Sequence, residues 1–162
     1  MLDDESIARY ARQIVVPGIG ATGQARLLTS TVLLVGNARG CETAGLFLRA
    51  SGVSTLRHDP PFALAEFDVV ILADAGAMDE ATRAMLLSTT KPICWYNCED
   101  FGFTAGIHPG TPIPDPISPQ PPRAEDEVTA AFHDAAATDA AAMACAILLR
   151  TPRQTGPFRF EV

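Results

Sequence analysis

The chain has 162 residues, of which 48% are hydrophobic and 19% charged, so it can bury a core and is too apolar for a disordered chain. Its formal net charge of −7 argues against a nucleic-acid-binding surface. No apolar run approaches the roughly 20 residues of a membrane span, and the polar start MLDDESIARY is unlike a signal peptide. We expect one domain, residues 1–162, that binds neither nucleic acid nor membrane.

The cysteines lie in apolar stretches, at Cys41, Cys94, Cys98 and Cys145. Such surroundings are typical of buried, reduced thiols, which favours a cytoplasmic protein, or a nuclear one if the source is eukaryotic. No second cysteine pair accompanies Cys94 and Cys98, so a zinc site is not expected.

Two helices are predicted before the first strand. Residues 3–16 place apolar side chains at helical spacing, with Asp3 or Asp4 available as the N-cap. Pro17 and Gly18 end this helix, and residues 20–29 form a second, shorter one. Helices in this place have no role in a bare dinucleotide-binding fold, so they suggest a specialised family or a dimer arm.

The stretch 31–52 is typical of the opening of a Rossmann-type unit. An apolar run at 32–35 predicts a strand that ends at Gly36. A short turn at 37–40 and a helix at 41–50 are expected to follow.

The glycine fingerprint of a nucleotide site is broken in this turn. The pattern G-x-G-x-x-G would need glycines at the positions of Ala38 and Cys41, and Arg39 stands where a phosphate would approach. We therefore expect a tight turn and close helix–strand packing, without a ligand, at Gly36, Asn37 and Gly40.

The rest of the chain alternates strands and helices. Further strands are expected at 53–57, 67–73, 93–96, 100–107 and 156–162, and helices at 79–87 and 126–150. Residues 109–122 contain seven prolines and predict a surface loop within the domain. The fold class is thus α/β, a truncated Rossmann-like, mostly parallel sheet with N-terminal helices and an antiparallel edge.

Other polar residues give no catalytic pattern. Asp59 follows the second strand, where it could meet a ribose hydroxyl or simply form part of a turn with the prolines after it. The histidines, expected at the surface or in turns, are His58, His108 and His133. No Ser-His-Asp or Cys-His arrangement follows from the spacing.

Several short motifs occur together in the order of a known family. They are Arg9-Tyr10-x-Arg12-Gln13-Ile14, Gly23-Gln24, the strand 32–36 and Gly52-Val53. This combination resembles the ThiF/MoeB/HesA and ubiquitin-activating enzyme (E1-like) family. The acidic-x-FG pattern within 97–106 and the final helix and strand are also similar to members of that family.

The departures from the active members are specific. Active members carry an Asn-x-x-Arg-Gln segment and a lysine after the second strand, and both are missing between Asp59 and Phe67. The single lysine, Lys91, lies in another element, whereas Asp74 could correspond to the metal-binding aspartate. The chain contains no inserted domain with a catalytic cysteine. It thus resembles a degenerate short member, similar to the non-catalytic subunit of SUMO-type activating enzymes.

The resemblance singles out Arg12. An arginine in this motif resembles an arginine finger that reaches across a dimer to ATP phosphates in the partner, with Arg9 and Gln13 as its neighbours. A guanidinium suits that role because it is always charged and can fork onto phosphate oxygens. The alternative is an exposed helix arginine that pairs with Asp4 or Glu5.

The resemblance implies a pseudoenzyme subunit that supports ATP-dependent adenylation of a ubiquitin-like protein's C-terminus by an active partner. The expected partner is a catalytic E1-like subunit or a second copy of the chain, and the ubiquitin-like protein is contacted indirectly. ATP and Mg²⁺ are expected in the partner, and no cofactor or metal in this chain. A homodimeric binding or scaffold protein without ATP chemistry is the alternative, and the broken glycine turn disfavours a small dinucleotide-dependent oxidoreductase.

Overall fold

The computed structural model describes residues 2–57, 66–75, 79–99, 102–113, 127–150 and 158–161. Its strands are β1 (Thr31–Gly36), β2 (Ser54–Arg57), β3 (Val69–Ala73), β4 (Ile93–Glu99), β5 (Gly102–His108) and β6 (Phe158–Glu161). Its helices are α1 (Asp4–Ile14), α2 (Gly20–Thr29), α3 (Ala38–Ala50), α4 (Glu80–Leu87) and α5 (Glu127–Leu148). The predicted elements are therefore confirmed in type and order.

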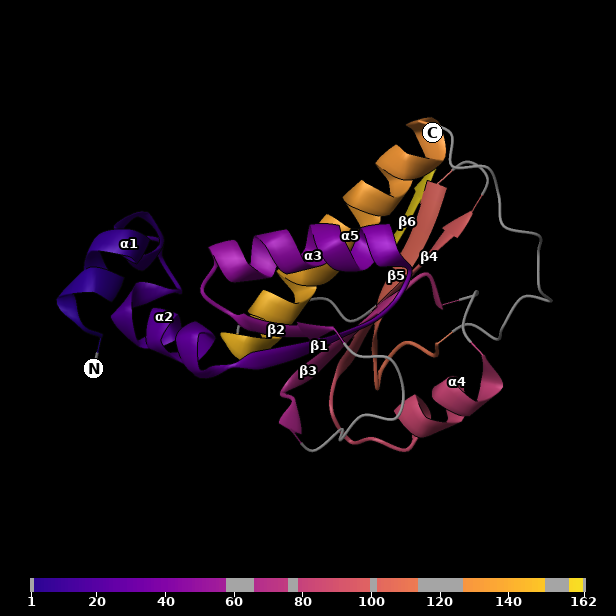
Figure 1. Ribbon diagram of the computed structural model, residues 1–162, viewed down its shortest axis with the longest axis horizontal. Coiled ribbons are helices and arrows are strands. Elements are labelled where there is room, and N and C mark those ends of the chain that lie inside the picture. The colour runs from indigo at the N-terminus through magenta and orange to yellow at the C-terminus, as the bar shows by residue number, and fades with distance from the viewer. Residues whose placement is uncertain are drawn as a thin grey trace.

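The strands form one sheet in the order β2-β1-β3-β4-β5-β6 (Figure 1). Strands β2, β1, β3 and β4 run parallel, whereas β5 and β6 pair antiparallel to their neighbours. The predicted fold class, an α/β Rossmann-like and mostly parallel sheet with an antiparallel edge, is confirmed. After β1 the chain forms β2 on one side of β1 and then β3 on the other side. From β3 it continues outward to β4.

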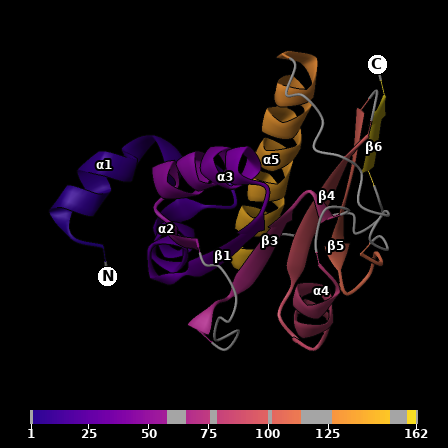
Figure 2. The ribbon, with the colours of Figure 1, turned by 45° about the vertical axis from the view of Figure 1, so that its right-hand side comes forward.

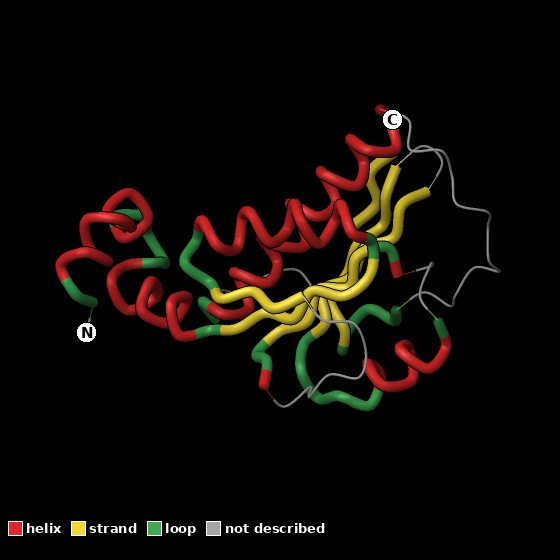
Figure 3. Tube along the Cα trace, in the orientation of Figure 1, coloured by secondary structure: helices red, strands yellow, loops and turns green. Residues whose placement is uncertain are grey.

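Apolar side chains alternate along β1 between two cores, because successive residues of a strand point to opposite faces. Val32 and Leu34 face the layer formed by α3 and α5, and Leu33 and Val35 belong to the core on the side of α4. Figures 2 and 3 show α3 and α5 on one face of the sheet and α4 on the other. Both faces are covered, which explains why the parallel strands read as continuous apolar runs.

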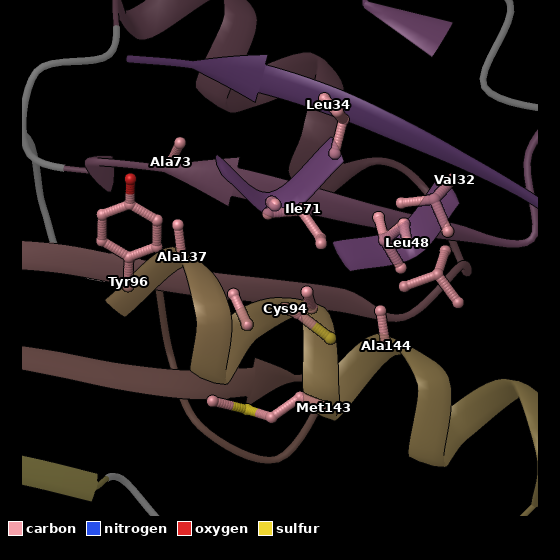
Figure 4. Close-up of a cluster of buried hydrophobic side chains, with 14 of the residues drawn as sticks. Val32, Leu34, Leu48, Ile71, Ala73, Cys94, Tyr96, Ala137, Met143 and Ala144 are labelled. Carbon is pink, nitrogen blue, oxygen red and sulfur yellow. The ribbon is translucent and has the colours of Figure 1, made fainter. Parts of the chain in front are cut away.

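The small residues of α5 allow this helix to lie close on the sheet. Its buried positions include Ala137, Ala140 and Ala144, which recur at helical spacing. Figure 4 shows Ala137, Met143 and Ala144 beside Cys94 and Tyr96 of β4. Buried apolar area of this kind contributes about 25 cal/mol per Å² to folding.

The N-terminal helices extend from one end of the sheet (Figures 1 and 3). Asp3 caps α1, because its carboxylate accepts a hydrogen bond of 2.7 Å from the Ser6 amide. The Gln13 side chain joins α1 to the far end of α3 by donating to the Ala50 carbonyl at 3.0 Å. Tyr10 is buried against this junction. No helix in the described ranges has the length and apolar character that a bilayer crossing requires.

Two local predictions differ from the structure. Helix α3 begins at Ala38, so the predicted turn at 37–40 is largely its first helical turn. Asn37 starts the helix early because its side chain accepts a 3.0 Å hydrogen bond from the Gly40 amide. The start of the proline-rich segment 109–122 is not a bare surface loop, since Thr111 and Ile113 are buried. The part of that segment after Ile113 lies outside the described residues.

Candidate functional site: the carboxyl edge of the sheet

The carboxyl ends of β1 and β3 meet where the strand order reverses. In open α/β sheets, ligands bind at such a switch point. Here β1 ends at Gly36 and leads into α3, while β3 ends at Ala73 and leads to Asp74. The glycine turn singled out in the sequence therefore lies at the position where this fold places a nucleotide.

The two strand ends are in direct backbone contact. The Asn37 amide donates to the Ala73 carbonyl at 2.9 Å. Gly36 has a φ of +104°, and a Cβ added there would lie against the Ala73 carbonyl oxygen. Glycine is thus required at this position by packing within the chain, as the sequence predicted.

Gly40 is required for a related reason. A Cβ on Gly40, in the first turn of α3, would collide with the hydroxyl of Tyr96. Tyr96 is fully buried, and its hydroxyl has no hydrogen-bond partner in the part of the chain that the structure describes. Burial raises the pKa of Tyr96 far above its usual range, and the nearby Cys98 and Asp74 add to the shift. The tyrosine is therefore a neutral phenol packed beneath the start of α3.

Arg39 is held by the chain itself. Its guanidinium donates to both carboxylate oxygens of Asp134 on α5, at 3.1 and 2.6 Å, in the forked geometry that arginine favours. The Thr43 hydroxyl donates to the same carboxylate at 2.7 Å. The Arg39 hydrogen bonds, and then that of Thr43, hold the pKa of Asp134 below its ordinary value. Arg39, which stands where a phosphate would approach, is thus bound to a carboxylate of its own chain, that of Asp134.

Asp74 has a left-handed backbone, a conformation uncommon outside glycine but adopted by aspartate and asparagine more often than by other residues. It follows β3 directly and has a φ of +62°, a conformation that costs most side chains about 1–2 kcal/mol. It is half-buried. Within the described ranges, no group of three or more histidine, cysteine or acidic side chains could hold a metal ion.

Arg12 lies far from this edge. Its neighbour Gln13 is bonded to Ala50, whereas the glycine turn is at the other end of α3, a helix of 13 residues and about 20 Å. Arg12 is exposed, and in the described ranges it forms no ion pair with Asp4 or Glu5. The structure therefore does not bring Arg12 to the glycine turn of its own chain.

The other two residues of the arginine motif have partners within the chain. Arg9 lies over the ring of Tyr10, with its guanidinium carbon 5.6 Å from the ring centroid. Gln13 is joined to α3 by the hydrogen bond to Ala50. The bond of Gln13 ties α1 to the end of α3, the contact of Arg9 stays within α1, and Arg12 is left exposed between them in the sequence.

The prediction that all three histidines are at the surface or in turns was wrong for His133. This residue lies in α5 and is only 5% exposed. Its position three residues before the buried Ala136 and four before Ala137 would have placed it on the sheet-facing stripe. His108 is half-buried at the end of β5, and His58 and Asp59 lie outside the described residues.

The fold and its edge define a Rossmann-like domain, and sequence comparison finds relatives over part of the chain. MOCS3 of Sus scrofa, an adenylyltransferase and sulfurtransferase, is 43% identical over 70 residues, which are 43% of this chain and 14% of that protein. MoeZ of Mycobacterium tuberculosis, a probable adenylyltransferase/sulfurtransferase, is 39% identical over 70 residues, or 43% and 16% of the two chains. Uba4 of Aspergillus niger is 46% identical over 54 residues, or 33% and 11%.

The aligned stretch of this chain is thus homologous to the ThiF/MoeB (E1-like) adenylyltransferases, and the predicted resemblance is confirmed over that stretch. The alignments span no more than 16% of the length of these three relatives. No protein-family profile matches the chain.

Solved structures agree with the fold over nearly the whole chain. A crystal structure of selenomethionine PaaA matches with a TM-score of 0.69 at 14% identity, covering 99% of this chain and 72% of PaaA. A heterocyclase in complex with substrate and cofactor matches with a TM-score of 0.50 at 15% identity, covering 92% and 23%. At these identities the matches establish the shared fold alone.

Proposed function

We propose that this chain is a non-catalytic subunit of an E1-like activating enzyme. In this role it supports ATP-dependent adenylation of the C-terminus of a ubiquitin-like protein, and an active partner subunit binds the ATP and Mg²⁺. The observation that carries the proposal is the self-occupied carboxyl edge, where Arg39 binds Asp134 and Gly36 is packed against Ala73. The homology to adenylyltransferases supports the class of reaction.

The self-occupied edge argues against nucleotide binding by this chain. A phosphate at the start of α3 would have to compete with the carboxylate of Asp134 for the Arg39 guanidinium, and would be repelled by that carboxylate. The break in the glycine fingerprint points the same way, since Ala38 and Cys41 bring side chains to positions where the backbone would approach a pyrophosphate.

Arg12 is the side chain proposed to act on the partner. It is exposed on α1, and two further exposed side chains nearby are apolar, Ile7 of α1 (47%) and Val15 at its C-cap (78%). Exposed Ala11 lies between them, so an apolar stripe formed by Ile7, Ala11 and Val15 is unpacked within the chain, although the helix is kinked at Tyr10. A partner that covers this stripe would bring its own surface next to Arg12. An arginine supplied in trans can accelerate phosphoryl transfer by about 10³–10⁵.

The same stripe favours the alternative, in which the chain is a homodimeric scaffold without ATP chemistry. A second copy could cover Ile7 and Val15 as well as another subunit could. A stable interface of either kind buries at least about 1,000 Å² in total. The two functions therefore share an interface and differ in what Arg12 does there.

The deciding experiment combines exchange kinetics with a matched charge control. The tagged chain is purified with the partner it captures from its native cells, and ATP–pyrophosphate exchange is measured in the presence of the ubiquitin-like protein. Arg12→Ala should slow exchange by tenfold or more, a loss of at least about 1.4 kcal/mol of transition-state stabilisation. Arg12→Lys should restore part of the rate, because an ammonium does not fork onto two phosphate oxygens.

The control is Arg49→Ala, which removes the same charge from an exposed position on α3, together with a surface hydrogen bond of 3.1 Å that Arg49 donates to the Thr55 hydroxyl. It should leave the exchange rate unchanged. Both alanine variants should keep the melting temperature within a few degrees of wild type, since an exposed helix arginine contributes within about 0.5 kcal/mol. An unchanged rate in a folded, assembled Arg12→Ala complex would remove the trans role and leave the scaffold. Exchange by the isolated chain would contradict the pseudoenzyme proposal itself.

A further inference from the structure

Cys98 and His133 meet on the face of the sheet that α5 covers. Cys98 lies near the end of β4, and His133 lies near the start of α5. The Cys98 sulfur is 3.4 Å from Nδ1 of His133, although the two residues are 35 positions apart in the chain. A thiol and an imidazole nitrogen at this distance can share a proton.

The surroundings fix the imidazole and leave the thiol partly open. His133 is buried, and its ring stands edge-on to the ring of Tyr96, with centroids 6.0 Å apart and an angle of 68°. The next residue, Asp134, is directed toward α3 by its bonds to Arg39. Cys98 itself is half-buried, in contrast to the buried Cys41 and Cys94.

This arrangement is the one that activates a cysteine. The thiolate is the nucleophilic form of the side chain, and an imidazole that takes the thiol proton leaves a thiolate stabilised by an adjacent imidazolium. Buried thiols without such a base are inert. The structure places an imidazole nitrogen within hydrogen-bonding distance of the Cys98 sulfur, and Cys98 is also partly accessible.

We propose that Cys98 is a site of covalent oxidation by small hydroperoxides, with His133 as the base that activates it. The Cys98 thiol passes its proton to Nδ1 of His133, and the thiolate attacks the nearer oxygen of hydrogen peroxide. A sulfur–oxygen bond forms while the oxygen–oxygen bond breaks. The leaving hydroxide takes the proton from His133 and departs as water, so that the sulfur is oxidised to a sulfenic acid and the peroxide is reduced.

The first test compares the thiols within one folded protein. The reduced, full-length chain is treated briefly with hydrogen peroxide in the presence of dimedone, which traps sulfenic acids, and adducts are quantified by peptide mass spectrometry. A parallel reaction with iodoacetamide measures thiolate reactivity without oxidation. Cys145 serves as the reference, because it is half-buried like Cys98. Cys98 should react at least about tenfold faster than Cys145 with both reagents.

The second test separates the base from a structural hydrogen-bond partner. His133→Asn keeps a polar atom near the position of Nδ1 but cannot take the proton, and His133→Ala removes both. Both variants should slow labelling of Cys98 by about tenfold or more and leave that of Cys145 unchanged. Added imidazole should restore part of the rate in His133→Ala. Buried Cys94 reports on folding, because it should stay unlabelled in any variant that remains folded.

Each outcome decides the proposal. Equal labelling of Cys98 and Cys145 in the wild-type chain would overturn it, whatever the variants do. A folded His133→Asn chain that labels at the wild-type rate would also overturn it, since the sulfur would then need no base. If Cys94 becomes labelled in the His133 variants, those variants are no longer folded. The ratio of Cys98 to Cys145 labelling in the wild-type chain then decides alone, and Cys98→Ser must abolish the faster-forming adduct.

Discussion

Replacement of Gly36 by alanine should test how tightly the carboxyl edge is closed. The new methyl group would have to adopt a φ of +104° and would lie against the backbone carbonyl of Ala73. The left-handed conformation costs about 1–2 kcal/mol, and overpacking against backbone about 1–3 kcal/mol more. We therefore expect Gly36→Ala to lower the free energy of unfolding by about 2–5 kcal/mol, which for a chain of this size lowers the Tm by about 4–20 °C.

The matched control is Gly18→Ala, at a glycine with a similar φ of +90° and no atom within 4 Å of the added Cβ. It carries the conformational cost without the contact, so it should lower the Tm by only about 2–8 °C. Urea unfolding of both variants, followed by circular dichroism, gives the free energies directly. If the two substitutions lower the free energy of unfolding by the same amount, the ends of β1 and β3 are free to separate. The argument that the chain fills its own nucleotide crevice is then refuted.

Two further substitutions address the same edge. Asp134→Asn should destabilise the chain by less than about 1 kcal/mol at neutral pH, because the pair with Arg39 is partly exposed. The folded-state pKa of Asp134 is lowered, so this stability is present above the ordinary carboxyl pKa and is lost as the pH falls through the folded-state pKa. The Tm values of wild type and variant should therefore converge as the pH falls below the ordinary carboxyl pKa. Tyr96→Phe should change the free energy of unfolding by no more than about 1 kcal/mol, and in the stabilising direction, because it removes a buried hydroxyl without a partner in the described chain.

The predictions for Asp134→Asn and Tyr96→Phe can each be contradicted by a specific result. A gap in Tm between Asp134→Asn and wild type that is constant with pH would mean that the carboxylate charge is irrelevant to the contact. A clear loss of stability in Tyr96→Phe, measured by urea unfolding, would mean that the phenol hydroxyl has a partner in solution, such as a bound water.

The order and type of the elements followed from local pattern. The strand around Val70 and the helix capped by Asp79 are encoded by periodicity and by capping residues within a few positions. The family motif in α1 could also be recognised from the sequence, because its residues are adjacent. Gly36 was also interpretable, since a glycine at the end of a buried strand indicates close packing of the backbone.

Contacts between segments that are distant in the chain could not be predicted from the sequence. The pairing of Arg39 with Asp134 depends on where α5 packs against α3, and a single chain gives no measure of that register. The proximity of Cys98 to His133 depends on the same packing. His133 was placed at the surface because histidine is polar, whereas its spacing from Ala137 indicated the buried stripe. The helical position of a residue was thus the better guide than its chemistry.

Both margins of the sheet are short in the part of the chain that the structure describes, and this bears on how the protein can associate. There β2 and β6, the two outermost strands, have four residues each. A strand of that length offers few unpaired amide and carbonyl groups on which a neighbouring chain could extend the sheet, and short margins of this kind protect natural proteins from aggregation through strand addition. Ordered assembly is therefore expected to use helical surfaces, so that a partner could bind or leave without disturbing the backbone hydrogen bonds of the domain.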